Sequence, residues 1–277
     1  MRVILIVERV VVQISYPLAS ENLCAGYAKR QIIHDVSLTI PAQKTTVIVG
    51  ANGSGKSTLL HTLARINPIQ SGKVMLGGED ISQLKRRDIA KKMSFLSQSA
   101  AIPENLKVAD LVARGRYPWQ GLLHQWSSED ENAVAEALAM TGLTPFKEYP
   151  VSALSGGQRQ RSWIAMTLAQ QTPLMLLDEP TTYLDLRYQV EILTLLQGLT
   201  QQQGKTLVMV LHDLNFALHF ADRLVFVKTG KVIAQLDDAR DCTPALIEET
   251  FGVRTHLVID PLTQKPLVVP QWSTHAV

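Results

Sequence analysis

Cysteine, long apolar runs and excess charge of either sign are all scarce in this sequence. Only two of the 277 residues are cysteines, Cys24 and Cys242, and they lie too far apart for metal-like spacing. We therefore expect free thiols in a reducing cytosol. No apolar run reaches the ~18 residues that a membrane span needs, and no small-residue cleavage site follows the apolar N-terminus. The formal net charge of +2 gives no nucleic-acid footprint. These absences predict a protein that binds no nucleic acid and reaches a membrane only through a partner.

What the sequence does have is the composition of an ordinary globular protein, with 46% hydrophobic and 19% charged residues. Its length allows one domain or two. The apolar N-terminal residues 1–17 are interrupted by Glu8 and Arg9, which fits either a strand or a translated upstream extension. The basic runs 85–87 and 91–92 are short, which is typical of a solvated helix face.

A glycine-rich stretch between a predicted strand and a predicted helix contains the main functional motif. Residues 44–49 form a short β-branched run, and apolar residues recur at helical spacing over 58–65. Between them lies the pattern G-x-x-x-x-G-K-[ST], whose backbone N–H groups surround phosphate oxygens at the positive end of a helix. Lys56 would reach the β- and γ-phosphates, and Ser57 would hold Mg²⁺. The predicted nucleotide-binding residues of this loop are Gly50, Ala51, Asn52, Gly53, Ser54, Gly55, Lys56, Ser57 and Thr58.

Three further predicted strands end in polar residues, namely Gln98, the pair Asp178 and Glu179, and His212. Two adjacent carboxylates at the end of a buried strand are costly unless they meet a cation or a polarised water. We therefore predict that Asp178 holds Mg²⁺ and that Glu179 orients or deprotonates water. Ligands bind at the carboxyl edge of open α/β sheets, so His212 is also predicted to be functional. Gln98 alone indicates little.

The region between these strands has a different character. Helical patterns over residues 99–153 predict a helical insertion between two α/β halves. The loop that follows opens another helix, and its serine hydroxyl and free backbone N–H groups predict a second anion site. Ahead of the phosphate loop we expect β-structure over 18–40. Within it, Tyr27 fits a half-buried strand aromatic as well as it fits a functional residue. The residues of the second predicted anion site are Leu154, Ser155, Gly156, Gly157 and Gln158.

In this order and combination, the motifs closely resemble the ATP-binding subunit of an ATP-binding cassette (ABC) transporter. Residues 154–158 match the family signature letter for letter, and residues 181–185 match the loop after its catalytic glutamate. The resemblance implies an α/β phosphate-loop NTPase with a RecA-like core, an antiparallel β subdomain and a helical insertion subdomain. It divides the chain into an N-terminal extension (1–17), the cassette (18–240) and a C-terminal tail (241–277).

The resemblance further implies that two cassettes pair head to tail as a homodimer. Each ATP would then lie between Lys56 of one copy and residues 155–158 of the other. Tyr27 would stack on the adenine ring, and Asp185 would help to form the dimer seam. ATP binding would close the dimer and hydrolysis would open it.

The resemblance also implies the catalytic roles. Glu179 would be the general base and His212 the switch that senses the γ-phosphate. Mg²⁺ would be held by Ser57, Gln98 and Asp178, and Gln98 would also link the site to the helical insertion. The implied cofactors are ATP and Mg²⁺.

Several segments resemble the uptake ATPases for iron–siderophore complexes and vitamin B12, and among these the ferric-siderophore branch. The segments are 115–119, 161–166, 181–186 and 251–270. The resemblance implies a peripheral subunit on the cytoplasmic face of the inner membrane, bound to two integral-membrane permease subunits. It would drive import of ferric siderophore delivered by a binding protein, which it would contact only indirectly. Changes over 116–119 are expected to weaken coupling to the permease more than basal hydrolysis.

Three other hypotheses remain open at this point. The nearest is an importer ATPase for cobalamin or haem. A soluble ABC ATPase of iron–sulfur assembly is a second class, whereas DNA-repair and translation members carry coiled-coil insertions or a second cassette that this sequence lacks. A catalytically inactive regulatory cassette is a third, and the presence of Lys56, Asp178, Glu179 and His212 argues against it.

Overall fold

The computed structural model describes residues 17–27, 30–98, 105–121, 126–182 and 184–272. The alternatives proposed for the N-terminal extension and the start of the predicted helical insertion lie outside these residues. No helix within the described ranges is long and apolar enough to cross a membrane.

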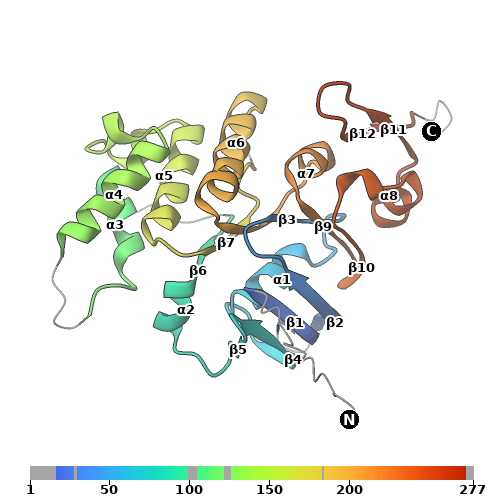
Figure 1. Ribbon diagram of the computed structural model, residues 1–277, viewed down its shortest axis with the longest axis horizontal. Coiled ribbons are helices and arrows are strands. Elements are labelled where there is room, and N and C mark those ends of the chain that lie inside the picture. Colours follow the sequence, from blue (N-terminus) through green and yellow to red (C-terminus); the bar gives the residue numbers. More distant parts are fainter. Residues whose placement is uncertain (1–16, 28–29, 99–104, 122–125, 183, 273–277) are drawn as a thin grey trace, which may run out of the picture.

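A six-stranded sheet forms the centre of the molecule (Figure 1), in the order β10-β9-β3-β8-β7-β6. Strands β9, β3, β8, β7 and β6 are parallel, and β10 pairs antiparallel with β9. This arrangement confirms the predicted α/β class. The strand bounds are Thr45–Val49 for β3, Met93–Leu96 for β6, Leu174–Asp178 for β7, Thr206–Val210 for β8, Arg223–Lys228 for β9 and Lys231–Leu236 for β10.

The order of the parallel strands brings the predicted site together. The phosphate loop follows β3, His212 follows β8, and the acidic pair ends β7. Because these strands are parallel neighbours, their carboxyl ends meet at one edge of the sheet. The register aligns them, since Asp178 pairs with Val210, the last residue of β8.

A second, antiparallel sheet has the strand order β2-β1-β4-β5. Its strands are β1 (Leu18–Tyr27), β2 (Arg30–Ile40), β4 (Ile69–Leu76) and β5 (Glu79–Asp80), which confirms the β-structure predicted ahead of the phosphate loop. Strands β4 and β5 form a hairpin whose turn is made by Gly77 and Gly78. Gly72 lies inside β4, where an added Cβ would come 2.3 Å from the carbonyl oxygen of Asn22 on the paired strand.

Helices cover both faces of the central sheet. At one end of the molecule, α3, α4 and α5 pack together, and this confirms the helical character predicted for the described part of the insertion (Figure 1). The α-helices are α1 (Lys56–Leu63), α2 (Arg86–Lys92), α3 (Val108–Ala113), α4 (Ser128–Met140), α5 (Gly156–Ala169), α6 (Leu186–Gln203), α7 (Leu214–Phe220) and α8 (Pro244–Phe251). Short 3-10 turns occupy Arg114–Arg116 (η1), Thr144–Phe146 (η2), Val151–Ala153 (η3) and Ala239–Asp241 (η4).

Alternation along the buried strands divides the core into two clusters. Val47 and Val49 of β3 face the cluster built with α3 to α8, whereas Ile48 faces the cluster built with α1 and the antiparallel sheet. This is the pattern of a parallel sheet that is covered on both faces, and it explains why the strands read as continuous apolar runs. Burial on both sides fixes the register and therefore fixes where each strand-end residue lies.

The C-terminal tail folds into α8 and then a hairpin of β11 (Thr255–Ile259) and β12 (Pro266–Pro270). The hairpin packs on α7, where the Asn215 amide donates to the Val268 carbonyl at 3.3 Å and accepts from the Val268 N–H at 2.7 Å. Asn215 therefore satisfies one backbone position of the hairpin as a neighbouring strand would.

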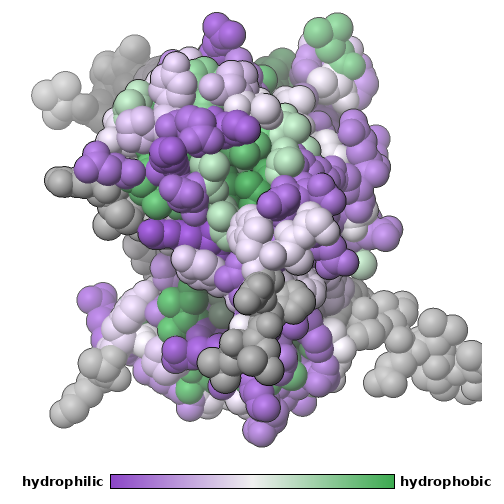
Figure 2. Space-filling model, turned by 90° about the vertical axis from the view of Figure 1, so that its left-hand side faces the viewer, coloured by the Kyte–Doolittle hydropathy of each residue, from purple (hydrophilic) through white to green (hydrophobic). Residues whose placement is uncertain are grey.

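The basic run on α2 is not a purely solvated face. Arg87 donates to the carbonyl oxygens of Pro118 and Trp119, and the Lys91 ammonium lies 4.9 Å from the Trp119 ring centre. Arg87 nevertheless stays exposed, as the prediction of a solvated face has it, while Lys91 is half-buried against the ring. Seen from the side of α3 and α4, the surface is mainly hydrophilic with smaller hydrophobic areas between the charged side chains (Figure 2).

Candidate functional site

The phosphate loop curls tightly between β3 and α1. At Gly50 an added Cβ would lie 2.1 Å from the Val227 carbonyl oxygen, so any other residue would displace the backbone. Gly53 has φ +74°, a left-handed conformation that costs glycine little. Lys56 opens α1 and is only 5% exposed, and its ammonium donates to the carbonyl oxygens of Gly50 at 2.9 Å and Ala51 at 3.1 Å. The Lys56 side chain thus links the start of α1 to the first two residues of the loop.

The loop is prepared for an anionic ligand. Burial lowers the pKa of Lys56, while the nearby carboxylates of Glu179 and Asp178 act in the opposite direction and favour its charged form. The Ser54 hydroxyl is buried and has no hydrogen-bond partner among the described residues. Leaving such a group unpaired costs about 1–3 kcal/mol, and a bound phosphate oxygen would remove that cost.

Asp178 lies beside the first turns of α1. Its side chain is 2% exposed, and the Ser57 hydroxyl donates to Oδ1 at 2.9 Å. The other oxygen, Oδ2, lies 2.9 Å from His61 Nε2. A hydroxyl and a carboxylate are the hard oxygen ligands that Mg²⁺ prefers, so this pair fits the predicted cation. The described residues contain no group of three His, Cys, Asp or Glu that could hold a metal ion unaided. A cation here would therefore share its coordination with the phosphates of a nucleotide.

Glu179 contacts both of the other predicted catalytic residues, Gln98 and His212. It is 7% exposed and has φ +51°, a strained conformation for a residue with a side chain. Its carboxylate accepts a hydrogen bond from the Gln98 amide, contacts His212 Nε2, and accepts from the Thr182 hydroxyl at 3.0 Å. The structure thus brings Gln98, Glu179 and His212 together. Thr182, which no motif marked as catalytic, stands among them.

Glu179 and His212 line an open pocket of about 360 Å³, whereas Gln98, Asp178 and Thr182 are not among its lining residues. The phosphate loop and the first turn of α1 form one wall, and Glu179 and His212 form another. Arg30 and Ile32 of β2 also line it, and no pattern in the sequence had marked them. As far as the described residues show, the lining includes none of residues 154–158.

Tyr27, predicted to stack on adenine, stands at the end of β1 with half of its surface exposed. Its hydroxyl accepts a hydrogen bond from the Asn67 amide at 3.0 Å. The ring is thus tied at its polar end and leaves apolar surface available, and its role toward a base stays a prediction.

The second predicted anion site opens α5. Ser155 caps this helix by accepting from the Gln158 N–H at 3.3 Å, while the Gln158 side chain accepts from the Ser155 N–H at 3.0 Å. A capping hydroxyl acts as an acceptor, so its own proton remains free to donate to an anion. Leu154 is buried in the core, whereas Ser155 and Gly156 are exposed. At Gly157 an added Cβ would lie 2.8 Å from the Tyr188 ring, so only glycine lets α5 approach α6 this closely.

Asp185, the predicted dimer-seam residue, begins α6. Its carboxylate accepts from the Tyr188 N–H at 3.1 Å and so caps the helix. The next residue, Leu186, is 69% exposed. The seam prediction itself is untested, but the structure gives Asp185 a structural role of its own.

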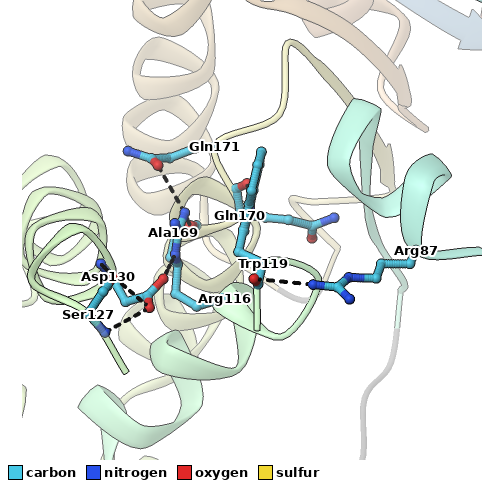
Figure 3. Close-up of polar contacts among 8 residues, drawn as sticks. All are labelled: Arg87, Arg116, Trp119, Ser127, Asp130, Ala169, Gln170 and Gln171. Carbon is cyan, nitrogen blue, oxygen red and sulfur yellow. Dashed lines mark hydrogen bonds and ion pairs between the residues drawn. The ribbon is translucent and has the colours of Figure 1, made fainter. Parts of the chain in front are cut away.

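A buried ion pair lies at the far end of α5 (Figure 3). Arg116 is 4% exposed, and its Nε donates to Asp130 Oδ1 at 2.7 Å. Its Nη1 donates to the Ala169 carbonyl at 2.8 Å and to the Gln171 side chain at 2.9 Å. Changes over residues 116–119 were predicted to weaken coupling to a permease, and this stays a prediction. The guanidinium of Arg116 is enclosed, so a change there would act on coupling through the packing of α4 and α5. Tyr117, 62% exposed, is the member of this segment that is available to a partner.

Strand, glycine-rich loop and helix, with a lysine in the loop and an acidic pair on a neighbouring parallel strand, together define a phosphate-loop ATPase. The comparisons with known proteins narrow this class. The sequence pattern of the ABC transporter family matches residues 33–182, and the chain belongs to this family. It is an ATP hydrolase whose activity is coupled to transport.

The curated relatives include several import ATPases. The chain is 46% identical to the ferric enterobactin transport ATP-binding protein FepC of Escherichia coli (strain K12), over 93% of this chain and 95% of that protein. It is 45% identical to the iron(3+)-hydroxamate import ATP-binding protein FhuC of Bacillus subtilis (strain 168), over 90% of this chain and 93% of that protein.

Among solved structures, the fold is similar to that of a metal-chelate type ABC transporter in an inward-facing conformation. The TM-score is 0.81 at 26% identity, over 94% of this chain and 99% of that one. A dimeric ATP-binding cassette in a post-hydrolysis state, bound to ADP and Pi, matches with a TM-score of 0.69 at 29% identity, over 79% of this chain and 97% of that one.

Proposed function

We propose that this chain is the ATP-hydrolysing subunit of an ABC importer that drives uptake of ferric siderophores. The observation that carries the proposal is the similarity to import ATPases for ferric enterobactin and iron(3+)-hydroxamate, which extends over at least nine-tenths of the chain. The site supports the ATPase part independently, because Lys56, Glu179 and His212 line one pocket and Asp178 bonds to Ser57 at its wall.

In the proposed reaction the phosphate loop binds the nucleotide phosphates through its backbone N–H groups and Lys56. Mg²⁺, when bound by the side chains of Ser57, Gln98 and Asp178, would neutralise charge that develops on the γ-phosphate. Glu179 orients and deprotonates the attacking water. His212 contacts Glu179 from the neighbouring strand end and is placed to sense the γ-phosphate.

The proposal includes a head-to-tail homodimer. The described lining of the pocket includes no residue of the signature segment 154–158. A second copy would supply this segment to the nucleotide, with Tyr27 stacked on the adenine and Asp185 at the seam. Neither half-site alone surrounds the γ-phosphate, so hydrolysis should require closure.

The proposal also places the dimer on the cytoplasmic face of the cell membrane, bound to two permease subunits. A binding protein would deliver the ferric siderophore, which the ATPase itself never needs to touch. In this assignment the chain is a cassette over 18–240 followed by an importer tail over 241–277. The nearest alternatives are import of cobalamin or haem, and a soluble role in iron–sulfur assembly.

Uptake of labelled ferric siderophores tests the proposal. Cells that lack this protein would be complemented with the wild type or with Lys56→Ala, at equal protein levels on an immunoblot. We expect uptake with the wild type only, because the variant loses the cation that bridges the loop and reaches the phosphates. If every siderophore enters normally while cobalamin or haem uptake falls, the substrate assignment is wrong and the ATPase assignment stands.

A further inference from the structure

His61 makes a contact with the acidic pair that the proposed mechanism does not use. Its Nε2 lies 2.9 Å from Asp178 Oδ2, while Ser57 donates to Oδ1 of the same carboxylate at 2.9 Å. Both donors belong to α1, where they are four residues apart. Residues at this spacing lie one above the other on one helix face. Two successive turns of α1 thus present one donor to each oxygen of Asp178.

The direction of the histidine bond follows from the chemistry of its partner. An ionised carboxylate only accepts hydrogen bonds, so the ring nitrogen that meets it must carry the proton. His61 is therefore a donor through Nε2, whichever state its other nitrogen has. The ring is also fixed from the side, because it meets the Phe95 ring of β6 edge-on, with 5.2 Å between ring centres and an interplanar angle of 81°.

The two donors differ in what a bound cation would do to them. Ser57 is itself a predicted ligand of Mg²⁺, so its contact with Asp178 must change when the cation binds. His61 bonds to the other oxygen and is a quarter exposed, outside the pocket lining. Its contact can therefore persist through nucleotide binding and release.

We propose that His61 is a positioning residue for the Mg²⁺ site, holding Asp178 Oδ2 so that Oδ1 stays directed at Ser57. This inference rests on the proposed nucleotide function and adds a residue to it. Outer-shell partners of this kind orient a ligand before the metal arrives, and removing one typically costs about 10–100-fold in metal affinity or activity. A carboxylate ligand without its partner must be ordered by the metal itself.

The test compares nucleotide affinity with and without Mg²⁺. The full-length chain would be titrated with a fluorescent ATP analogue in excess Mg²⁺ and in EDTA. His61→Leu keeps apolar bulk against Phe95 but removes the donor, and His61→Gln restores an N–H donor. We expect His61→Leu to bind the analogue in EDTA with the wild-type affinity. In this variant, the factor by which Mg²⁺ raises the affinity should be about tenfold smaller than in the wild type. His61→Gln should recover most of that gain.

Phe95→Leu is the matched control, because it removes the ring contact and leaves the donor in place. It should retain most of the Mg²⁺ effect. As a second readout, the Mg²⁺ concentration for half-maximal hydrolysis should rise about tenfold in His61→Leu, with a smaller change in the maximal rate.

The remaining outcomes oppose the inference in different ways. Equal Mg²⁺ dependence in His61→Leu and wild type would overturn it. Equal loss of affinity with and without Mg²⁺ would show a structural role instead, and so would failure of His61→Gln to recover. If the wild type binds no ATP analogue, the proposed function fails first. If the wild type binds it but gains nothing from Mg²⁺, the metal site and the role of His61 are both wrong.

Discussion

Asp130 and Asp178 are buried to nearly the same extent, at 1% and 2% exposure, but their charges are compensated differently. The Asp130 carboxylate accepts from the Arg116 guanidinium at 2.7 Å and from the N–H and hydroxyl of Ser127 at 3.1 and 3.0 Å. Its countercharge is part of the chain. Asp178 has a hydroxyl and an imidazole as direct partners, and a second buried carboxylate, Glu179, follows it.

The difference indicates which buried acid belongs to a ligand site. Burying a carboxylate is costly unless a cation compensates it. Arg116 supplies that cation to Asp130 permanently, so the helical end is complete without a ligand. At the nucleotide pocket, the Lys56 ammonium is the positive charge near two carboxylates, Asp178 and Glu179. Its own burial lowers its pKa and so disfavours its charged form. This site gains most from a cation that arrives with the substrate, which is the property expected of a functional site.

The largest expected effect is on catalysis, through Glu179→Gln. The variant keeps the shape of the side chain and its position beside Gln98 and His212 but cannot take a proton from water. Hydrolysis should fall by about 10²–10⁴-fold, while ATP binding is retained. The measurements are the ATPase rate and nucleotide affinity, with size-exclusion chromatography in ATP to follow the dimer. We expect the variant to remain as a closed dimer, and a monomeric variant that hydrolyses ATP at the wild-type rate would contradict the assigned role.

The second-largest expected effect is on stability and concerns Asp130, the other carboxylate of the comparison. Arg116→Met removes the guanidinium and leaves Asp130 buried without its cation. We expect a loss of about 3–5 kcal/mol in the free energy of unfolding, the typical effect of breaking a buried pair from one side. Denaturant unfolding of the purified chain measures it. A loss below about 1 kcal/mol, the range of exposed ion pairs, would mean that water reaches Asp130.

The control for this change removes both charges at once. Arg116→Met combined with Asp130→Leu replaces the pair by apolar side chains of similar volume. Such replacements are often neutral, so the double variant should recover most of the lost stability. Full recovery is not expected, because the Ala169 carbonyl also loses a donor.

These two acids also show what the sequence could reveal. Asp178 and Glu179 were recognisable because they end an apolar strand, and parallel neighbours bring Gln98 and His212 to the same edge. Asp130 was visible only as one of several acids in the first turn of a helix. Its pairing with Arg116 spans 14 positions and depends on how η1, α4 and α5 pack, which no local pattern encodes.

The same reason explains the other omissions. His61 belongs to the predicted first helix, where nothing distinguishes it until α1 is placed against β7. The docking of the tail on α7 through Asn215 likewise depends on two segments that are 53 residues apart. Local motifs thus predicted the residues proposed to contact the nucleotide, whereas the residues that hold those in place could be identified only from the fold.

The smallest expected effect is the pH dependence of the Asp130 pair. Burial opposes ionisation of this carboxyl, but the hydrogen bonds from Arg116 and Ser127 outweigh burial and lower its pKa below the ordinary value. An aspartate in an unfolded chain has a pKa of about 3.9. The contribution of the pair to stability is therefore fully present above that pH and is lost as the pH falls through the lower folded pKa. The unfolding free energy of the wild type should therefore fall relative to that of the double variant from pH 5 toward about pH 3. Subtracting the double variant removes the titration of the other carboxylates, so a difference that stays constant over this range would mean that Asp130 is not held ionised by Arg116.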